Sequence, residues 1–153
     1  MSTPELNARI QAAQQAVLGQ TERLHRDFGQ VESRWKSDGT RVTATDIAIS
    51  EGIFADLSRR FPDDQFLSEE LAGTKDPIAV TAGFAWILDP IDGTANFVHG
   101  FPAVGVSIAL VRDGRPVVGV VHAPFLGETY RAVRGAGASV EREDGVSPLI
   151  VSD

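Results

Sequence analysis

The chain has 153 residues, 42% of them hydrophobic and 23% charged, and its 14 Lys and Arg against 21 Asp and Glu give a formal net charge of −7 at pH 7. This length and composition are typical of one globular domain with a sizeable core. The negative balance argues against a nucleic-acid-binding surface, which needs clustered cations. The lack of cysteine excludes disulfides, thiolate nucleophiles and cysteine-ligated zinc.

The first residues lack the basic and apolar blocks of a signal peptide. The longest apolar stretch, residues 103–111, is about half the length of a membrane span. We therefore expect a cytoplasmic protein that does not bind a membrane.

Two helices are predicted in the first part of the chain. Residues 4–28 have apolar side chains at helical spacing and Gly29 as a stop, which predicts one amphipathic helix. Residues 31–37 predict a short strand and residues 37–40 a turn. A threonine with a nearby acid at residues 43–46 then predicts the start of a second helix, which Pro62 ends.

Two short apolar strands follow, and each ends in a pair of acids. Residues 65–68 run into Glu69 and Glu70, and residues 85–88 run into Asp89 and Asp92. Because Pro90 fixes φ and has no N–H, we expect a rigid turn after Asp89 and not a continuing strand. The connection at residues 72–84 is long enough to move over a site.

The remainder of the chain predicts hairpins. Strands are expected at residues 103–111, 116–122 and 128–133, with the first two joined by the turn signal Asp113-Gly114. Gly135-Ala136-Gly137 lies between strands without a following lysine, which favours a bend in the sheet over a phosphate loop. The predicted fold class is α+β, with two helices packed on one face of an antiparallel sheet.

The acids suggest a metal site when they are considered together. The candidates are Asp46, Glu69, Glu70, Asp89 and Asp92. Any one of them alone is explained more simply as a helix cap or a surface charge. Two carboxylates on a stiff turn repel each other unless a cation lies between them. Oxygen ligands favour Mg²⁺ or Mn²⁺, since the three histidines show no metal-ligand spacing and are expected to be structural or surface groups.

Gly93 and Thr94 suggest an anion site beside that metal. Glycine lets the backbone approach an anion closely, and amides at the start of a helical turn point toward it. A divalent cation next to such amides suits a phosphate ester. Two interpretations of Thr94 stay open, because its hydroxyl is equally suited to orienting a water and to capping a helix.

The segment Trp86-Ile87-Leu88-Asp89-Pro90-Ile91-Asp92-Gly93-Thr94-Ala95-Asn96-Phe97 resembles the first signature of the inositol monophosphatase family of Mg²⁺-dependent, lithium-sensitive phosphatases. Ser68-Glu69-Glu70 resembles the family's glutamate motif. Lys36 with Asp38-Gly39-Thr40, and Val42-Thr43-Ala44-Thr45-Asp46, resemble its lysine and Thr-Asp elements. The family's second signature, which begins with Trp-Asp, has no counterpart here, so residues 1–153 resemble only the amino-terminal metal- and phosphate-binding domain of the layered αβαβα fold.

The resemblance implies a role for each site residue. Glu69, Asp89 and the Ile91 carbonyl would bind a first metal, and Asp89 and Asp92 a second, in a complete site of two or three Mg²⁺ ions. Thr94 and Glu69 would activate water, with Asp46 acting through its neighbours. The amides of Gly93 and Thr94 would hold the phosphate, and Asp92 would also face a substrate hydroxyl. Lys36 and Glu70 would support the groups that contact the metal.

The implied function is Mg²⁺-dependent hydrolysis of a small phosphorylated metabolite similar to inositol monophosphate. Related activities on histidinol phosphate or fructose bisphosphate remain alternatives. A different alternative is a non-catalytic metal-binding or assembly domain, because the second metal would lack a ligand. A half-fold is expected to expose an apolar face, so we expect either a homodimer or association with a complementary carboxy-terminal fragment.

Overall fold

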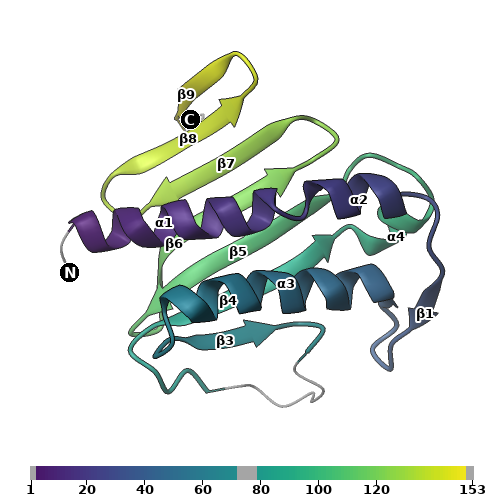
Figure 1. The fold of residues 1–153 in the computed structure, drawn as a ribbon, viewed down its shortest axis with the longest axis horizontal. Coiled ribbons are helices and arrows are strands. Elements are labelled where there is room, and N and C mark those ends of the chain that lie inside the picture. The colour runs from purple at the N-terminus through teal and green to yellow at the C-terminus, as the bar shows by residue number, and fades with distance from the viewer. Residues whose placement is uncertain (1–2, 72–78, 151–153) are drawn as a thin grey trace.

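The computed structural model describes residues 3–71 and 79–150 and shows helices α1 and α3 lying across one face of a seven-stranded sheet (Figure 1). The helices are α1 (Thr3–Leu18), α2 (Thr21–Asp27), α3 (Ala44–Arg60) and α4 (Thr94–Val98). The strands are β1 (Ser33–Trp35), β2 (Arg41–Thr43), β3 (Gln65–Ser68), β4 (Ala85–Asp92), β5 (Gly105–Arg112), β6 (Arg115–Ala123), β7 (Glu128–Val133), β8 (Gly137–Arg142) and β9 (Gly145–Leu149).

Helix α3 forms as its sequence predicts. The Thr43 side chain accepts hydrogen bonds from the backbone N–H groups of Thr45 and Asp46, and the Asp46 side chain accepts one from the Thr43 N–H, which makes a reciprocal cap. Ile49, Ile53 and Leu57 are fully buried on one side of the helix. This cap therefore holds Asp46 rigidly at the end of α3 where the site lies.

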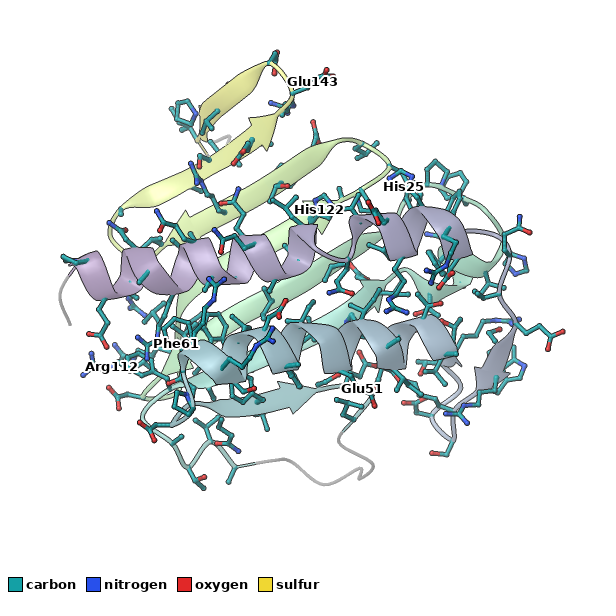
Figure 2. The ribbon with its side chains drawn as sticks, viewed as in Figure 1. His25, Glu51, Phe61, Arg112, His122 and Glu143 are labelled. Atoms are coloured by element: carbon teal, nitrogen blue, oxygen red, sulfur yellow. The ribbon has the colours of Figure 1, made fainter. Side chains whose placement is uncertain are left out.

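The prediction of a single helix over residues 4–28 is wrong, because the chain breaks between α1 and α2. Thr21 Oγ1 donates to Leu18 O at 2.8 Å, so its only proton is used. The ring Nε2 of His122 lies 2.9 Å from Thr21 Oγ1. Because the Thr21 proton is already used, Nε2 must donate to this hydroxyl oxygen. His122, labelled in Figure 2, is buried and fixes this break to strand β6.

The main sheet has the order β3-β4-β5-β6-β7-β8-β9. The predicted meander is confirmed from β4 to β9, where each strand pairs antiparallel with the next. Strand β3 instead pairs parallel with β4, so the sheet is mixed and the expectation of a fully antiparallel sheet is wrong. The α+β class, with α1 and α3 on one face, is confirmed (Figure 1).

Strand β4 also differs from its prediction. It continues through Pro90 to Asp92, where the prediction placed a turn. Its register against β5 shifts between Asp89 and Asp92. A bulge of this kind tolerates proline, because the residues within it need no ladder hydrogen bond.

The face of the sheet opposite α1 and α3 has exposed apolar side chains. Trp86 and Leu88 are buried, so Ile87 between them points to the other face and is 44% exposed. By the same alternation Val121, next to His122, is 40% exposed on that face. Two apolar side chains are thus exposed on that face, and an apolar surface that binds a partner stays a prediction.

No helix among the described residues is long and apolar enough to span a membrane. Most of the connection at residues 72–84, which was expected to move over the site, lies outside the described residues, since these omit 72–78.

Candidate metal and phosphate site

The candidate site lies at one end of the sheet, where strands β3 and β4 end near the start of α3 and the β1–β2 hairpin (Figure 1). Ser68 pairs with Leu88, and the Glu69 N–H donates to the Leu88 carbonyl at 3.3 Å. The parallel pairing therefore brings Glu69 to the level of Asp89.

A cavity of about 360 Å³ opens at this end of the sheet. The residues of the predicted site that line it are Lys36, Glu69, Glu70, Asp89, Ile91, Asp92, Gly93 and Thr94. Asp46 is completely buried beneath this surface, where its side chain contacts Thr94. A larger hollow of about 530 Å³ between α1 and strands β7–β9 has no acidic residue in its lining, so it does not suit a cation.

Asp89 is the most strongly perturbed carboxyl group of the site. Burial has the largest effect on its pKa, and together with the negative charges of Glu69, Asp92 and Asp46, in that order, it raises the pKa to about 6, while a hydrogen bond from the Ile91 backbone lowers it. These repulsions require the carboxylates to be near one another. The cluster therefore holds more negative charge than its own hydrogen bonds neutralise, which is the electrostatic condition for binding a cation.

Lys36 reaches into the cluster from the β1–β2 hairpin. Its ammonium donates to Glu69 Oε1 at 3.0 Å and to Glu70 Oε1 at 2.9 Å. Burial lowers the pKa of Lys36, but the bonds to Glu70 and Glu69 outweigh it and raise the pKa above its usual value. Burial also raises the pKa of Glu70, against the effect of Lys36.

Thr94 links the cavity to Asp46. Its hydroxyl lies 2.9 Å from the Ile91 carbonyl and 3.3 Å from Asp46 Oδ1. The other oxygen of Asp46 accepts from the backbone N–H and the hydroxyl of Thr43, at 2.7 and 2.6 Å. Burial raises the pKa of Asp46, while the hydrogen bonds from Thr43 and Thr94 lower it. The carboxylate is thus oriented with one oxygen toward the Thr94 hydroxyl.

Gly93 makes the sharp transition from β4 to α4. Its φ is 90°, in the left-handed region, and a Cβ there would lie 2.7 Å from the Ala103 carbonyl oxygen. Only glycine fits this position. The backbone N–H groups that follow open a helical turn, where the first amides have no acceptor within the helix.

The donor set suits a hard divalent cation. Carboxylates and one backbone carbonyl are the ligands that Mg²⁺ prefers. Within residues 3–71 and 79–150, however, no three acidic, histidine or cysteine side chains are arranged so that they could hold a metal as they stand. The Glu69 carboxylate accepts a hydrogen bond from Lys36 through Oε1 in this arrangement.

Sequence reasoning missed two residues of this region, Trp35 and Arg41, which line the cavity. Thr43, which belongs to the predicted helix start at residues 43–46, also holds Asp46. Trp35 and Arg41 flank the predicted Lys36 and Asp38-Gly39-Thr40 elements, and that position next to a turn was the available signal.

Comparisons with known proteins agree with this geometry. The sequence profile of the inositol monophosphatase family matches residues 2–152. An inositol-1-monophosphatase of Mesorhizobium japonicum is 41% identical over 136 residues, covering 87% of this chain and 48% of that protein. A histidinol-phosphatase of Chlorobaculum parvum is 41% identical over 136 residues, covering 89% and 50%. The solved Thermotoga maritima IMPase superposes with a TM-score of 0.80 at 33% identity, covering 99% of this chain and 55% of that one.

The chain thus spans about half the length of the curated relatives it matches. The signature at residues 86–97, the fold and the profile match over nearly all 153 residues agree with one another. The chain belongs to the inositol monophosphatase family.

Proposed function

We propose that the chain is the amino-terminal, metal- and phosphate-binding domain of a Mg²⁺-dependent phosphatase that hydrolyses a small phosphate monoester. The observation that carries the proposal is the group of carboxylates around Asp89, with a pKa raised to about 6, beside the turn at Gly93 and Thr94. The names of the relatives, an inositol-1-monophosphatase and a histidinol-phosphatase, support a phosphorylated metabolite as substrate. An ester similar to inositol monophosphate is the first candidate, with histidinol phosphate and fructose bisphosphate as alternatives.

Each acid has a proposed role in binding the metal ions. Glu69, Asp89 and the Ile91 carbonyl would hold one ion, and Asp89 and Asp92 a second. Bound Mg²⁺ would neutralise phosphate oxygens and lower the pKa of a nearby water. Lys36 and Glu70 would keep Glu69 close to its binding position, since Lys36 contacts both glutamates.

The chain's own residues would move the proton of the attacking water. The Thr94 hydroxyl can donate to Asp46 Oδ1 at 3.3 Å, so its oxygen is free to accept a hydrogen bond from water. As the water loses its proton to Thr94 Oγ1, the hydroxyl proton of Thr94 would pass to the Asp46 carboxylate. Glu69 would be the second acceptor. The amides of Gly93 and Thr94 would hold the phosphate, and Asp92, exposed at the end of β4, would contact the alcohol part.

Further properties follow from the family resemblance. We propose inhibition by lithium, a cytoplasmic location and a homodimeric assembly. The net charge of −7 supports partners other than nucleic acid.

The test is phosphate release from inositol 1-phosphate and from histidinol phosphate. It is measured with Mg²⁺ and with EDTA, for this chain and for this chain fused to the second half of the Mesorhizobium relative. We expect Mg²⁺-dependent hydrolysis that Asp92→Asn lowers by at least about 100-fold. Asp56→Asn, at an exposed position of α3, is the matched control. An inactive fusion, or equal rates for the two variants, would refute the assignment.

A second candidate function is a non-catalytic assembly domain that binds a complementary chain. The exposed Ile87 and Val121 on the face without α1 and α3 favour it. Sedimentation of the chain alone and mixed with the relative's second half tests this candidate. A chain that stays monomeric and does not bind the added fragment would contradict this candidate.

A further inference from the structure

The β1–β2 hairpin contributes a stacked pair of side chains to the cavity. Trp35 and Arg41 face each other in the hairpin register and both line the cavity. The guanidinium carbon of Arg41 lies 4.1 Å from the centre of the Trp35 ring. Arg41 Nη1 also donates to Ser33 Oγ at 2.7 Å. Two contacts therefore fix the orientation of the guanidinium plane before any ligand arrives.

The hairpin is itself tied to the carboxylate cluster. The Lys36 N–H donates to the Thr40 carbonyl at 2.8 Å, and Asp38 Oδ1 accepts from the Thr40 N–H at 2.9 Å, which closes the turn. From this turn Lys36 reaches Glu69 and Glu70. The Trp35–Arg41 pair therefore has a defined position relative to the residues proposed to bind metal.

The surroundings of the pair differ from those of the other cations near the site. Lys36 is engaged by two glutamates, whereas Arg41 forms no ion pair within the part of the chain that the structure describes. Trp35 is 66% exposed at the cavity although it is among the largest apolar side chains of the protein. A stacked guanidinium on a residue that lines a cavity is suited to bidentate binding of a phosphate or a carboxylate.

One ligand can contact both ends of the cavity. Arg41 and Thr94 both line the same space of about 360 Å³, which accommodates a small metabolite. A phosphate monoester at Gly93 and Thr94 would direct its alcohol part away from the metal cluster. Its substituents would then meet the hairpin.

We infer that Arg41, oriented by Trp35 and Ser33, binds a second anionic group of the substrate, a phosphate or carboxylate on the alcohol part. The inference rests on the proposed function, because it takes the first phosphate to lie at Gly93 and Thr94. Arg41 is then a specificity-determining residue that favours an ester with a second anionic group, such as the fructose bisphosphate alternative, over inositol monophosphate. Trp35 is a positioning residue that acts through Arg41.

Paired ligands test this assignment. Binding of glucose 1,6-bisphosphate, glucose 1-phosphate and inorganic phosphate is measured by calorimetry with Mg²⁺, and phosphate release is followed in the same samples. We expect Arg41→Gln to weaken binding of the bisphosphate at least about tenfold more than binding of the monophosphate. Arg41→Lys should lose most of this preference, because lysine keeps the charge but neither the fork nor the stacking. Arg34→Gln, an exposed arginine of the same hairpin that does not line the cavity, should keep the wild-type preference.

The role of Trp35 is tested by size and aromaticity. Trp35→Phe retains a ring under Arg41 and should keep the preference for the bisphosphate, whereas Trp35→Leu should lose it. Thermal melting identifies variants that fail to fold, and a purely structural role of Trp35 would shift the melting temperature without changing the ratio of the two affinities.

Several outcomes would overturn the inference. One is a loss of affinity in Arg41→Gln that is equal for glucose 1,6-bisphosphate and glucose 1-phosphate. The others are the same loss of preference in Arg34→Gln, or a loss of affinity in Arg41→Gln for inorganic phosphate alone. A preference that depends on Arg41 without any metal-dependent hydrolysis would support the anion site while refuting the proposed function. Metal-dependent hydrolysis without that preference would support the proposed function while refuting the anion site.

Discussion

The Asp89 carboxyl is held by the fold in a state that is unfavourable without a cation. Its pKa of about 6 lies above the ordinary value of 3.8, so the folded chain keeps the proton more tightly than the unfolded chain. Between pH about 4 and 6 the metal-free protein should therefore lose stability as the pH rises. For a fully buried group the loss would be about 3 kcal/mol, and solvent screening of this half-buried carboxylate reduces it to ~1 kcal/mol.

Asp89→Asn should abolish this dependence. In EDTA the variant is expected to be more stable than the wild type at pH 7 by ~1 kcal/mol, because the repulsion with Glu69, Asp92 and Asp46 is gone. With Mg²⁺ the order should reverse, since metal binding stabilises only the wild type. Urea unfolding at pH 4 and pH 7, with and without Mg²⁺, measures both effects. A variant that is less stable than the wild type in EDTA at pH 7 would contradict the repulsion.

Thr94 should be required for its hydroxyl and not for its shape. Thr94→Val removes the group that bonds Asp46 and Ile91, so we expect kcat to fall about 100-fold or more with a small change in KM. Thr94→Ser keeps the hydroxyl and should stay within about tenfold of the wild type. Steady-state kinetics on the fused chain gives both numbers. Equal losses in the two variants would assign Thr94 to packing or capping alone.

The sequence predicted the residues of the cavity better than their partners. Glu69, Asp89, Asp92, Gly93 and Thr94 could be found because they stand at strand ends and in a recognisable signature. The partners depend on contacts across the fold. No local pattern shows that Lys36 bonds Glu70, or that Trp35 stacks on Arg41 across a hairpin.

The junction between β4 and α4 depends on one backbone conformation. Gly93→Ala would combine an unfavourable φ of 90° with a Cβ only 2.7 Å from the Ala103 oxygen. We expect a loss of about 3 kcal/mol of unfolding free energy, or failure to fold. Gly127→Ala separates the two causes, because Gly127 has a φ of 65° but nothing within 4 Å of its Cβ position. That control should cost about 1 kcal/mol in the same urea titration. Equal costs would mean that the contact with Ala103 is unimportant.

Local sequence patterns predict individual helices and strands, but they do not predict long-range contacts that end a helix or the direction in which two strands pair. Apolar spacing runs on through residues 4–28, but the chain breaks at Gly19 and Gln20, where Thr21 bonds His122 far away in sequence. The parallel pairing of β3 with β4 was likewise not visible, since a strand pattern does not reveal the direction of its neighbour. The capped start of α3 and the β5–β6 hairpin are local features, and the prediction of both is confirmed.

For the molecule as a whole, the open face of the sheet should govern association. Ile87→Lys places a charge on that face in strand β4, where Ile87 pairs with Ala109. We expect it to abolish self-association or binding of the complementary fragment, because burying an unpaired charge is costly. Analytical ultracentrifugation measures this effect. Leu126→Lys, at a leucine 64% exposed in the β6–β7 turn, is the matched control and should leave association unchanged.

The overall class could be predicted because it follows from the order of hydrophobic patterns. Two helical segments and then a series of hairpins allow few arrangements other than helices on one face of a sheet. What covers the other face is not encoded in any single strand. Ile87 and Val121 are apolar like their buried neighbours on the other face, and apolar residues on both faces are typical of a sheet that is buried on both sides. Within the described residues, helices α1 and α3 cover only one of the two faces.

The residues of the site and the last three strands of the sheet come from different parts of the chain. Every residue proposed for the site lies between positions 33 and 94, whereas β7, β8 and β9 pair only with their chain neighbours farther along the sheet. Hairpins added in this way can lengthen or shorten without moving the cavity. The exposed turn at Glu143 and Asp144 is therefore the natural place to insert a fluorescent or affinity peptide into a working protein.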